Sequence, residues 1–229
     1  MKKTLTVLAV SSALLTSSAF ADGLWKTYHV KITNITAHQV ITPPTVVAHN
    51  GKYHMFNITR PASAELAIMA ETGNPGPLAM AASENDNVYS VEIGKDNAGE
   101  PTVIPPGHSL VVEIEAPSSA FFTVAGMLAS SNDAFMGAAN IKAPRDNKKS
   151  RRHAMTYDAG TEMNNEDCAY VPGPPCSEES GNARAEFDSA TGERISEGFV
   201  SIHNGIHGHG DLMPKYYDWR GPTAYITIE

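Results

Sequence analysis

The chain is poor in cysteine and in basic residues, and after its start it has no apolar run long enough to cross a membrane. Its 229 residues include two cysteines, and 25 Asp and Glu outnumber 17 Lys and Arg, for a formal net charge of −8. An acidic surface argues against nucleic acid and against anionic membranes as partners, because both attract basic proteins. The lack of a later run of about 20 apolar residues argues against a membrane-spanning helix.

The sequence also lacks the motifs that commonly identify an enzyme. It contains no nucleophile elbow, no phosphate-binding glycine loop and no dinucleotide fingerprint. Ser130 and Ser131 beside Asp133 suggest a hydrolase only if His153 or His207 lies close by as a base, and nothing in the sequence brings these groups together. The other catalytic alternative is a glycosidase pair formed by Asp158 and Glu162. We expect a protein that binds a ligand and does not catalyse a reaction.

The first 21 residues predict an export signal. Lys2 and Lys3 form a charged start, residues 5–15 are short and apolar, and residues 19–21 (Ala-Phe-Ala) fit a small-x-small cleavage site. We therefore expect a bacterial protein of the periplasm or the extracellular space, with one mature domain over residues 22–229. Without the two lysines, the formal charge changes from −8 to −10.

The two cysteines, Cys168 and Cys176, favour one disulfide in such an oxidising compartment. The bond would close a short loop, which corresponds to a stabilisation of about 2–3 kcal/mol. Its expected role is local, because it would restrain only the segment around Pro172–Pro175.

Short strands separated by turn residues dominate the rest of the chain. Residues 62–70 form the best helix candidate, with Ser63 as its cap, and residues 78–82 add one further turn. Residues 40–47 are predicted as an extended connection, and the polar segment 164–197 as the least structured part. The predicted strands cover residues 26–35, 88–93, 109–115, 121–128, 152–157, 198–203 and 224–228. This pattern is typical of an all-β protein, an antiparallel β-sandwich with one or two short helices and long loops.

Three carboxylates stand out in two of the predicted loops. Asp158 ends a predicted strand, and Gly160 allows a turn that brings Glu162 back toward it. Asp133 follows the strand 121–128 after a short turn, so the three groups converge if these strands are neighbours. Grouped oxygen donors suit Ca²⁺, which takes six to eight oxygens. The alternative is that both aspartates only accept hydrogen bonds from their own turns and that Glu162 is simply exposed.

Five stretches of the chain resemble the spondin N-terminal domain family, which occurs in an animal extracellular-matrix protein and in many secreted bacterial proteins. The stretches are Tyr28–Asn34, the helix segment 62–73, the two acidic loops Ser131–Gly137 and Tyr157–Glu162, and the tail from Gly198 to Ile228. Together they span nearly all of the predicted mature domain.

The resemblance implies a C2-like antiparallel β-sandwich that binds Ca²⁺ at one edge. Carried over by position, the metal ligands would be Asp133, Asp158 and Glu162. Animal members have Asp where this chain has Glu162, and they have a cysteine arrangement that is missing here. The implied role is adhesion or matrix interaction, with a protein or glycan partner that the sequence does not identify.

A rival metal site lies in the segment from His203 to Met213. His203, His207 and His209 fall within seven residues, and imidazole ligands suit copper or zinc. This segment predicts a periplasmic transition-metal protein as the alternative function. The other interpretation is a flexible glycine-rich loop in which His207 caps a turn or packs on Trp219.

Overall fold

The computed structural model describes residues 24–145, 148–176 and 196–229, so the predicted export signal lies outside the described residues. The strands are β1 (Trp25–Asn34), β2 (Thr45–His49), β3 (Val88–Ile93), β4 (Ser109–Pro117), β5 (Phe121–Met127), β6 (Ala134–Lys142), β7 (Ser150–Asp158), β8 (Ser201–Ile202) and β9 (Ala224–Ile228). The helices are α1 (Ala64–Thr72), α2 (Gly76–Ser83) and α4 (Pro214–Tyr217). The predicted all-β class is confirmed.

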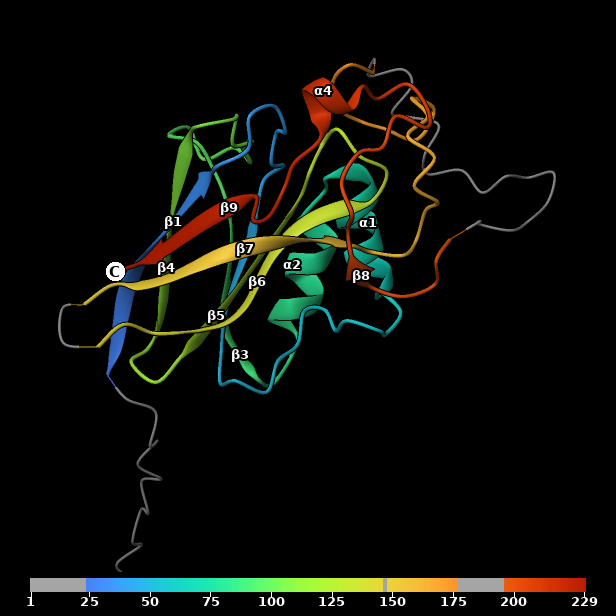
Figure 1. The fold of residues 1–229 in the computed structure, drawn as a ribbon. Coiled ribbons are helices and arrows are strands. Elements are labelled where there is room, and N and C mark those ends of the chain that lie inside the picture. Colours follow the sequence, from blue (N-terminus) through green and yellow to red (C-terminus); the bar gives the residue numbers. More distant parts are fainter. Residues whose placement is uncertain (1–23, 146–147, 177–195) are drawn as a thin grey trace, which may run out of the picture.

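The strands form one antiparallel sheet that bends into a sandwich (Figure 1). Its order is β3-β2-β5-β6-β7-β9-β1-β4, with β8 added beside β7. The bend lies in β7, because its residues 150–154 pair with β9 whereas residues 155–158 pair with β6. A strand that changes partners along its length joins the two layers at a corner. The end strands β3 and β4 are linked by a hydrogen bond of 2.5 Å from the Ser90 hydroxyl to the Glu115 carbonyl.

The main core lies between the two layers of the sandwich. On β1 the alternating residues Tyr28, Val30 and Ile32 are buried, as the sequence pattern predicts. They share one cluster with inward residues of the opposite layer, including Phe122, whose ring lies 5.1 Å from that of Tyr28. Alternation therefore identifies the strands that have one face in this core and the other in solvent.

The two longer helices cover the outer face of the opposite layer, where α1 lies over β5 and β6 and α2 lies over β2 and β3 (Figure 1). Ser63 caps α1 as predicted, accepting from Leu66 N, and the helix ends at Gly73 with φ +72°. Leu66 and Met69 pack on Met127 of β5 in a second buried cluster. Because β5 is covered on both faces, its sequence is apolar except for Thr123 and shows no alternation.

Three elements differ from the sequence prediction. Residues 45–49, expected to lie partly in an extended connection, form the fully buried strand β2. Strand β6 was not predicted, because Gly137, Ala138 and Ala139 follow the acidic loop and carry little β preference. Helix α2 is a full helix from Gly76 to Ser83, whereas only one turn was expected at 78–82.

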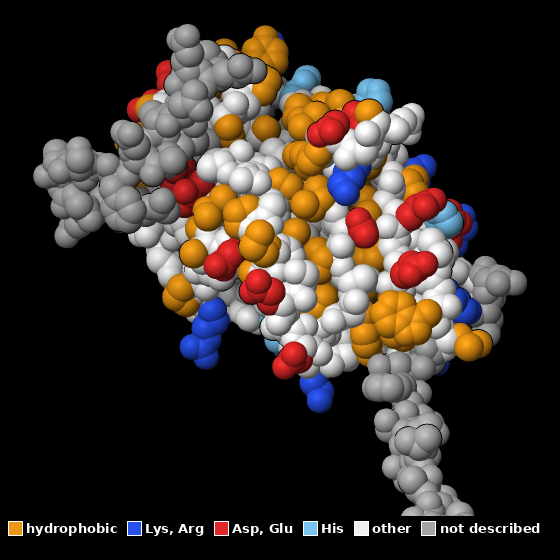
Figure 2. Space-filling view, turned by 180° about the vertical axis from the view of Figure 1, so that it is seen from behind, with side chains coloured by type: hydrophobic (Ala, Val, Ile, Leu, Met, Phe, Trp, Pro, Cys, Tyr) orange, Lys and Arg blue, Asp and Glu red, His pale blue; other side chains and the backbone are white. Residues whose placement is uncertain are grey.

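One end of the sandwich carries the long loops and α4. The predicted disulfide between Cys168 and Cys176 is formed there. A small apolar cluster of Val171, Ile206 and Leu212 lies beside it. In the part of the chain that the structure describes, no helix is long and apolar enough to cross a membrane. Acidic side chains are scattered over the rear face among apolar ones (Figure 2).

Candidate functional site

Strand pairing brings Asp133 and Asp158 together at the loop end of the sandwich. Asp133 directly precedes β6, and Asp158 is the last residue of β7. Ala134 is the register partner of Asp158, and Ala159 N donates to the Asp133 carbonyl at 3.2 Å. The condition stated for the convergence is not met as given, because β6 lies between β5 and β7 and provides the pairing itself. Both aspartates are buried, with exposed fractions of 0% and 4%.

The carboxylate of Asp133 is unequally satisfied. Its Oδ2 accepts hydrogen bonds from Thr161 N at 2.8 Å, from the Thr161 hydroxyl at 3.1 Å and from Glu162 N at 3.1 Å. Its Oδ1 is buried and accepts no hydrogen bond from any described residue. Burial, and then the nearby Asp158 carboxylate, raise the pKa of Asp133 to about 7 against the opposing hydrogen bonds. A buried oxygen without a donor is costly and calls for an explanation, such as a bound ion.

The carboxylate of Asp158 has a different set of partners. Its Oδ1 accepts from Gly160 N at 2.6 Å, which closes the turn after β7. Its Oδ2 accepts a short hydrogen bond from the Asn164 amide, and the same amide nitrogen reaches Glu197 at 3.4 Å. Burial raises the pKa of Asp158, and the hydrogen bonds from Asn164 and Gly160 oppose that shift. One amide group therefore bridges two carboxylates.

A chain of hydrogen bonds sets the orientation of that amide. Gly205 N donates to Nδ1 of His203 at 3.0 Å, so the proton of the neutral ring is on Nε2. Nε2 lies 2.9 Å from the Asn164 side-chain oxygen and donates to it. The amide nitrogen of Asn164 must then face Asp158. His203 thus positions the group that bonds the Asp158 carboxylate.

The turn between these groups requires glycine. Gly160 has φ +69°, and a Cβ there would lie 2.2 Å from the Phe199 carbonyl oxygen. The turn places the backbone of Glu162 against Asp133, whereas its side chain is half-buried. The structure thus brings Asp133 and Asp158 together, with Glu162 following within the same turn. Over residues 24–145, 148–176 and 196–229, no three His, Cys, Asp or Glu side chains form a group arranged to hold a metal ion.

The alternative interpretation, in which the two aspartates only accept hydrogen bonds from their own turns, is correct for part of the site. Asp158 caps its own turn through Oδ1, as the alternative expects. Asp133 differs, because its Oδ2 accepts from residues 28 and 29 positions away and its Oδ1 is unused by the described residues. Turn capping therefore accounts for one oxygen of Asp158 and does not account for the buried Oδ1 of Asp133.

Sequence reasoning missed Asn164 and Glu197, which contact or approach Asp158. Asn164 lies two residues after Glu162, at the start of the polar segment 164–197, and this proximity was the available signal. Residues 177–195 of that segment lie outside the described residues. Glu197 carried no signal, because its approach to Asp158 depends on how the chain returns to β8.

The structure divides the histidine set predicted as a rival metal site. His203 is buried, both of its ring nitrogens are hydrogen-bonded, and its ring lies 5.0 Å from that of Trp219. Burial, and then His207, lower the pKa of His203 to about 4. His207 and His209 are exposed and lie side by side. The packing expected of His207 on Trp219 is therefore made by His203.

Comparisons with protein-family models and with curated proteins found no match to this chain. The resemblance to the spondin N-terminal family therefore remains a prediction from the acidic loops, the helix segment and the tail.

Proposed function

We propose that this chain is an exported, non-catalytic Ca²⁺-binding β-sandwich module of the spondin N-terminal type, used for adhesion or matrix interaction. The observation that carries the proposal is the buried Oδ1 of Asp133, which accepts no hydrogen bond from the described residues and lies near a second carboxylate. Two buried carboxylates repel each other unless a proton or a cation lies between them. A cation with oxygen preference would satisfy both.

The residues present fit Ca²⁺ better than a softer metal. Asp133 and Asp158 would supply carboxylate oxygens, and Glu162 would add a third from the same turn. Backbone carbonyls and water complete such sites, because Ca²⁺ accepts a flexible shell of oxygens. For Asp158 to use Oδ2, the Asn164 amide that now bonds this oxygen must turn away. This competition is consistent with a weak, extracellular type of site, with Kd of about 10⁻⁴–10⁻³ M.

The location supports an interaction role. The acidic pair lies at the loop end of the sandwich, where loops carried by a rigid sheet commonly form binding surfaces. The disulfide next to these loops is compatible with an oxidising compartment, in agreement with the proposed export. Ca²⁺ would order the loop end and so prepare a surface for a protein or glycan partner.

The test is a thermal unfolding scan of the purified protein after chelation and after addition of Ca²⁺, Mg²⁺, Zn²⁺ or Cu²⁺. With about 10 mM Ca²⁺ and a Kd near 0.5 mM, mass action stabilises the fold by about 2 kcal/mol. For a chain of this length, that shift corresponds to about 4–8 °C. The Asp158→Asn variant should lose the Ca²⁺ response.

The matched control is Asp96→Asn. Asp96 also caps a turn, accepting from Ala98 N at 2.8 Å and from Glu100 N at 3.0 Å, but it is exposed, whereas Asp158 is buried. This variant should keep the full Ca²⁺ response. No Ca²⁺ shift in the unmodified protein, or an equal shift in Asp158→Asn, would reject the acidic site.

A further inference from the structure

The loop from His203 to Asp211 is held by a buried carboxylate, although it is rich in glycine. Glu166 accepts backbone hydrogen bonds from His207 N at 2.5 Å, Gly208 N at 2.6 Å and His209 N at 2.8 Å. Glu166 is 2% exposed, and its own backbone N donates to the Asn132 side chain at 3.0 Å. Three bonds to one carboxylate fix the backbone of three consecutive residues. The flexible loop expected from the glycines is thus replaced by a restrained one.

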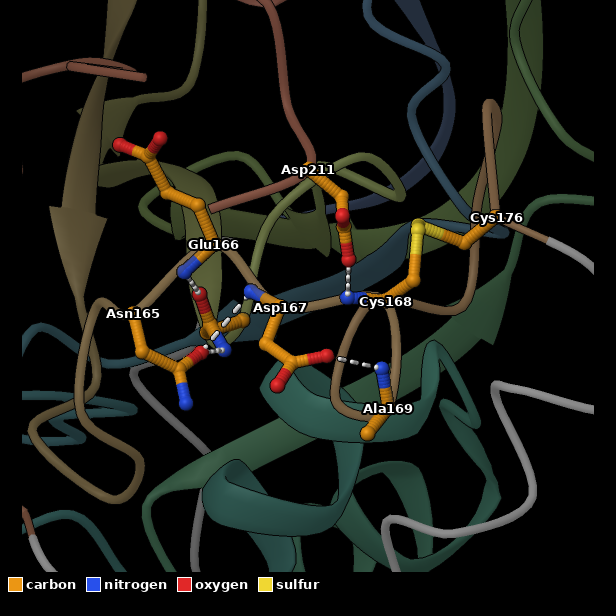
Figure 3. The surroundings of a disulfide bond; sticks show 8 residues. Asn165, Glu166, Asp167, Cys168, Ala169, Cys176 and Asp211 are labelled. Carbon is orange, nitrogen blue, oxygen red and sulfur yellow. Dashed lines mark hydrogen bonds between the residues drawn. A yellow bond between two sulfur atoms is a disulfide. The ribbon is translucent and has the colours of Figure 1, made fainter. Parts of the chain in front are cut away.

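A second set of contacts holds the far end of this loop. Asp211 N donates to the Glu166 carbonyl at 2.8 Å, and Cys168 N donates to the Asp211 carboxylate at 2.9 Å (Figure 3). Cys168 is itself anchored by the disulfide to Cys176. Gly210 allows the close approach, because a Cβ there would lie 2.5 Å from the Glu166 carbonyl oxygen. The loop is therefore joined to the disulfide segment at both its centre and its end.

These restraints hold two imidazole rings side by side at the surface. The ring centroids of His207 and His209 are 5.5 Å apart, and both side chains are exposed. Neither ring forms a hydrogen bond with another described residue, whereas both ring nitrogens of His203 are engaged. A ring bound through nitrogen at about 2.1 Å has its centroid about 3.2 Å from the metal, so two rings are about 5 Å apart at a tetrahedral angle and about 4.5 Å apart at the right angle typical of Cu²⁺. The observed spacing of 5.5 Å is slightly larger, so both exposed side chains must rotate to bring one nitrogen of each onto the metal.

We propose that His207 and His209 together bind one divalent transition-metal ion, with Cu²⁺ held more tightly than Ni²⁺ or Zn²⁺. The preference follows from the general order of affinities of divalent metals for nitrogen ligands. The Glu166 carboxylate beneath the loop adds a favourable negative charge without acting as a ligand, since its oxygens already accept the three amides. Water would fill the remaining coordination positions.

This site is separate from the proposed Ca²⁺ site in both chemistry and residues. Imidazole nitrogen is a poor ligand for Ca²⁺, and buried carboxylates alone are a poor match for Cu²⁺. The exposed pair His207 and His209 shares no side chain with the acidic pair Asp133 and Asp158. Failure of one site therefore leaves the other open to measurement.

The experiment is a titration of the purified protein with Cu²⁺, followed by equilibrium dialysis and by electron paramagnetic resonance. We expect one saturable site per chain, with hyperfine splitting from two nitrogen ligands. The double variant His207→Gln, His209→Gln should lose this site while its circular dichroism stays unchanged, because both side chains are exposed and the backbone bonds to Glu166 remain possible.

The matched control is His153→Gln, which removes an exposed histidine whose ring lies against Tyr225. It should keep the Cu²⁺ site, and Asp158→Asn should keep it as well. The proposal is overturned if the double variant binds Cu²⁺ as the unmodified protein does. It is equally overturned if the unmodified protein shows no saturable site or a spectrum without two nitrogen ligands.

Discussion

Replacing Asp133 by Asn removes a buried charge and keeps nearly the same shape. The Asn side-chain oxygen can take the place of Oδ2 and accept the same bonds from Thr161 and Glu162. The amide nitrogen then takes the place of Oδ1, which accepts no hydrogen bond from the described residues. In the absence of metal, the variant should therefore be more stable than the unmodified protein at neutral and higher pH.

The magnitude follows from the pKa of Asp133, which burial and the nearby Asp158 carboxylate raise from its ordinary value of 3.8 to about 7 in the folded protein. A difference of about three pKa units is equivalent to about 4 kcal/mol. Because the folded pKa is raised, the carboxyl group contributes its stability below pH 4 and loses it as the pH rises toward 7 and beyond. The two amide protons of Asn need partners, and leaving them unsatisfied costs about 1–3 kcal/mol. The net gain at pH 8 is then about 1–3 kcal/mol.

The assay is urea unfolding of both proteins at pH 4, 6 and 8 with a chelator present. At pH 4, where the folded aspartic acid is already neutral, we expect Asp133→Asn to be slightly less stable than the unmodified protein, because mainly the cost of its amide protons remains. We expect the variant to be the more stable protein at pH 8. Addition of about 10 mM Ca²⁺ should stabilise the unmodified protein by about 2 kcal/mol and leave the variant unchanged. A variant that is less stable at pH 8, or a difference that does not depend on pH, would refute the reasoning.

Three further predictions concern other parts of the molecule. Reduction of the bond between Cys168 and Cys176 should lower the free energy of unfolding by about 2–3 kcal/mol, measured by urea unfolding with and without reductant. If adding reductant destabilises a variant that lacks both cysteines by the same amount, the disulfide is not the cause. Burial, and then His54, lower the pKa of His49 to about 4, so its contribution is complete above pH 6.5 and is lost as the pH falls toward 4. His49→Gln should therefore reduce the fall in stability between pH 6.5 and 4 by up to about 3 kcal/mol, and an unchanged pH profile would contradict it. Glu166→Gln replaces a charged acceptor of backbone hydrogen bonds by a neutral one, so it should lower the free energy of unfolding by about 2–3 kcal/mol. Hydrogen exchange at amides 207–209 should become faster; slow exchange there would show that other contacts hold the loop.

The strands that have one face in the core were predictable, because burial on a single face produces alternation in the sequence. β9 (Ala224–Ile228), in which buried and half-buried residues alternate, was located with the bounds that the structure shows. β3 (Val88–Ile93) was also located with its correct bounds, although all of its residues are half-buried. β6 escaped notice because Gly137 lies where a larger residue would meet Phe56, with a Cβ only 2.8 Å from that ring. Tight packing selected a residue of low β preference, so the local pattern contradicted the final structure.

In the candidate site, too, the local sequence pattern identified some residues and could not reveal contacts between distant segments. The aspartates were identifiable because they adjoin turn residues at the ends of apolar segments. Their partners Asn164 and Glu197 were not, since side-chain contacts across 6 and 39 positions depend on the path of the intervening chain. The carboxylate of Glu166 was also missed, because a buried acidic residue in a polar segment looks like a solvated one.

One short polar segment, from Asp158 to Glu166, connects the two candidate sites. Asn164 bonds Asp158 on one side and His203 on the other, and Glu166 holds the amides that follow His203 in the chain. If a cation displaces the Asn164 amide from Asp158, the bond that positions His203 must rearrange as well, because its Nε2 proton then faces a moved acceptor. His203 is buried and begins the loop that carries the paired imidazoles, so rearrangement of its hydrogen bond would reach that loop through the backbone. The hydrogen bonds thus provide a physical route by which occupation of the acidic pair would alter the histidine loop.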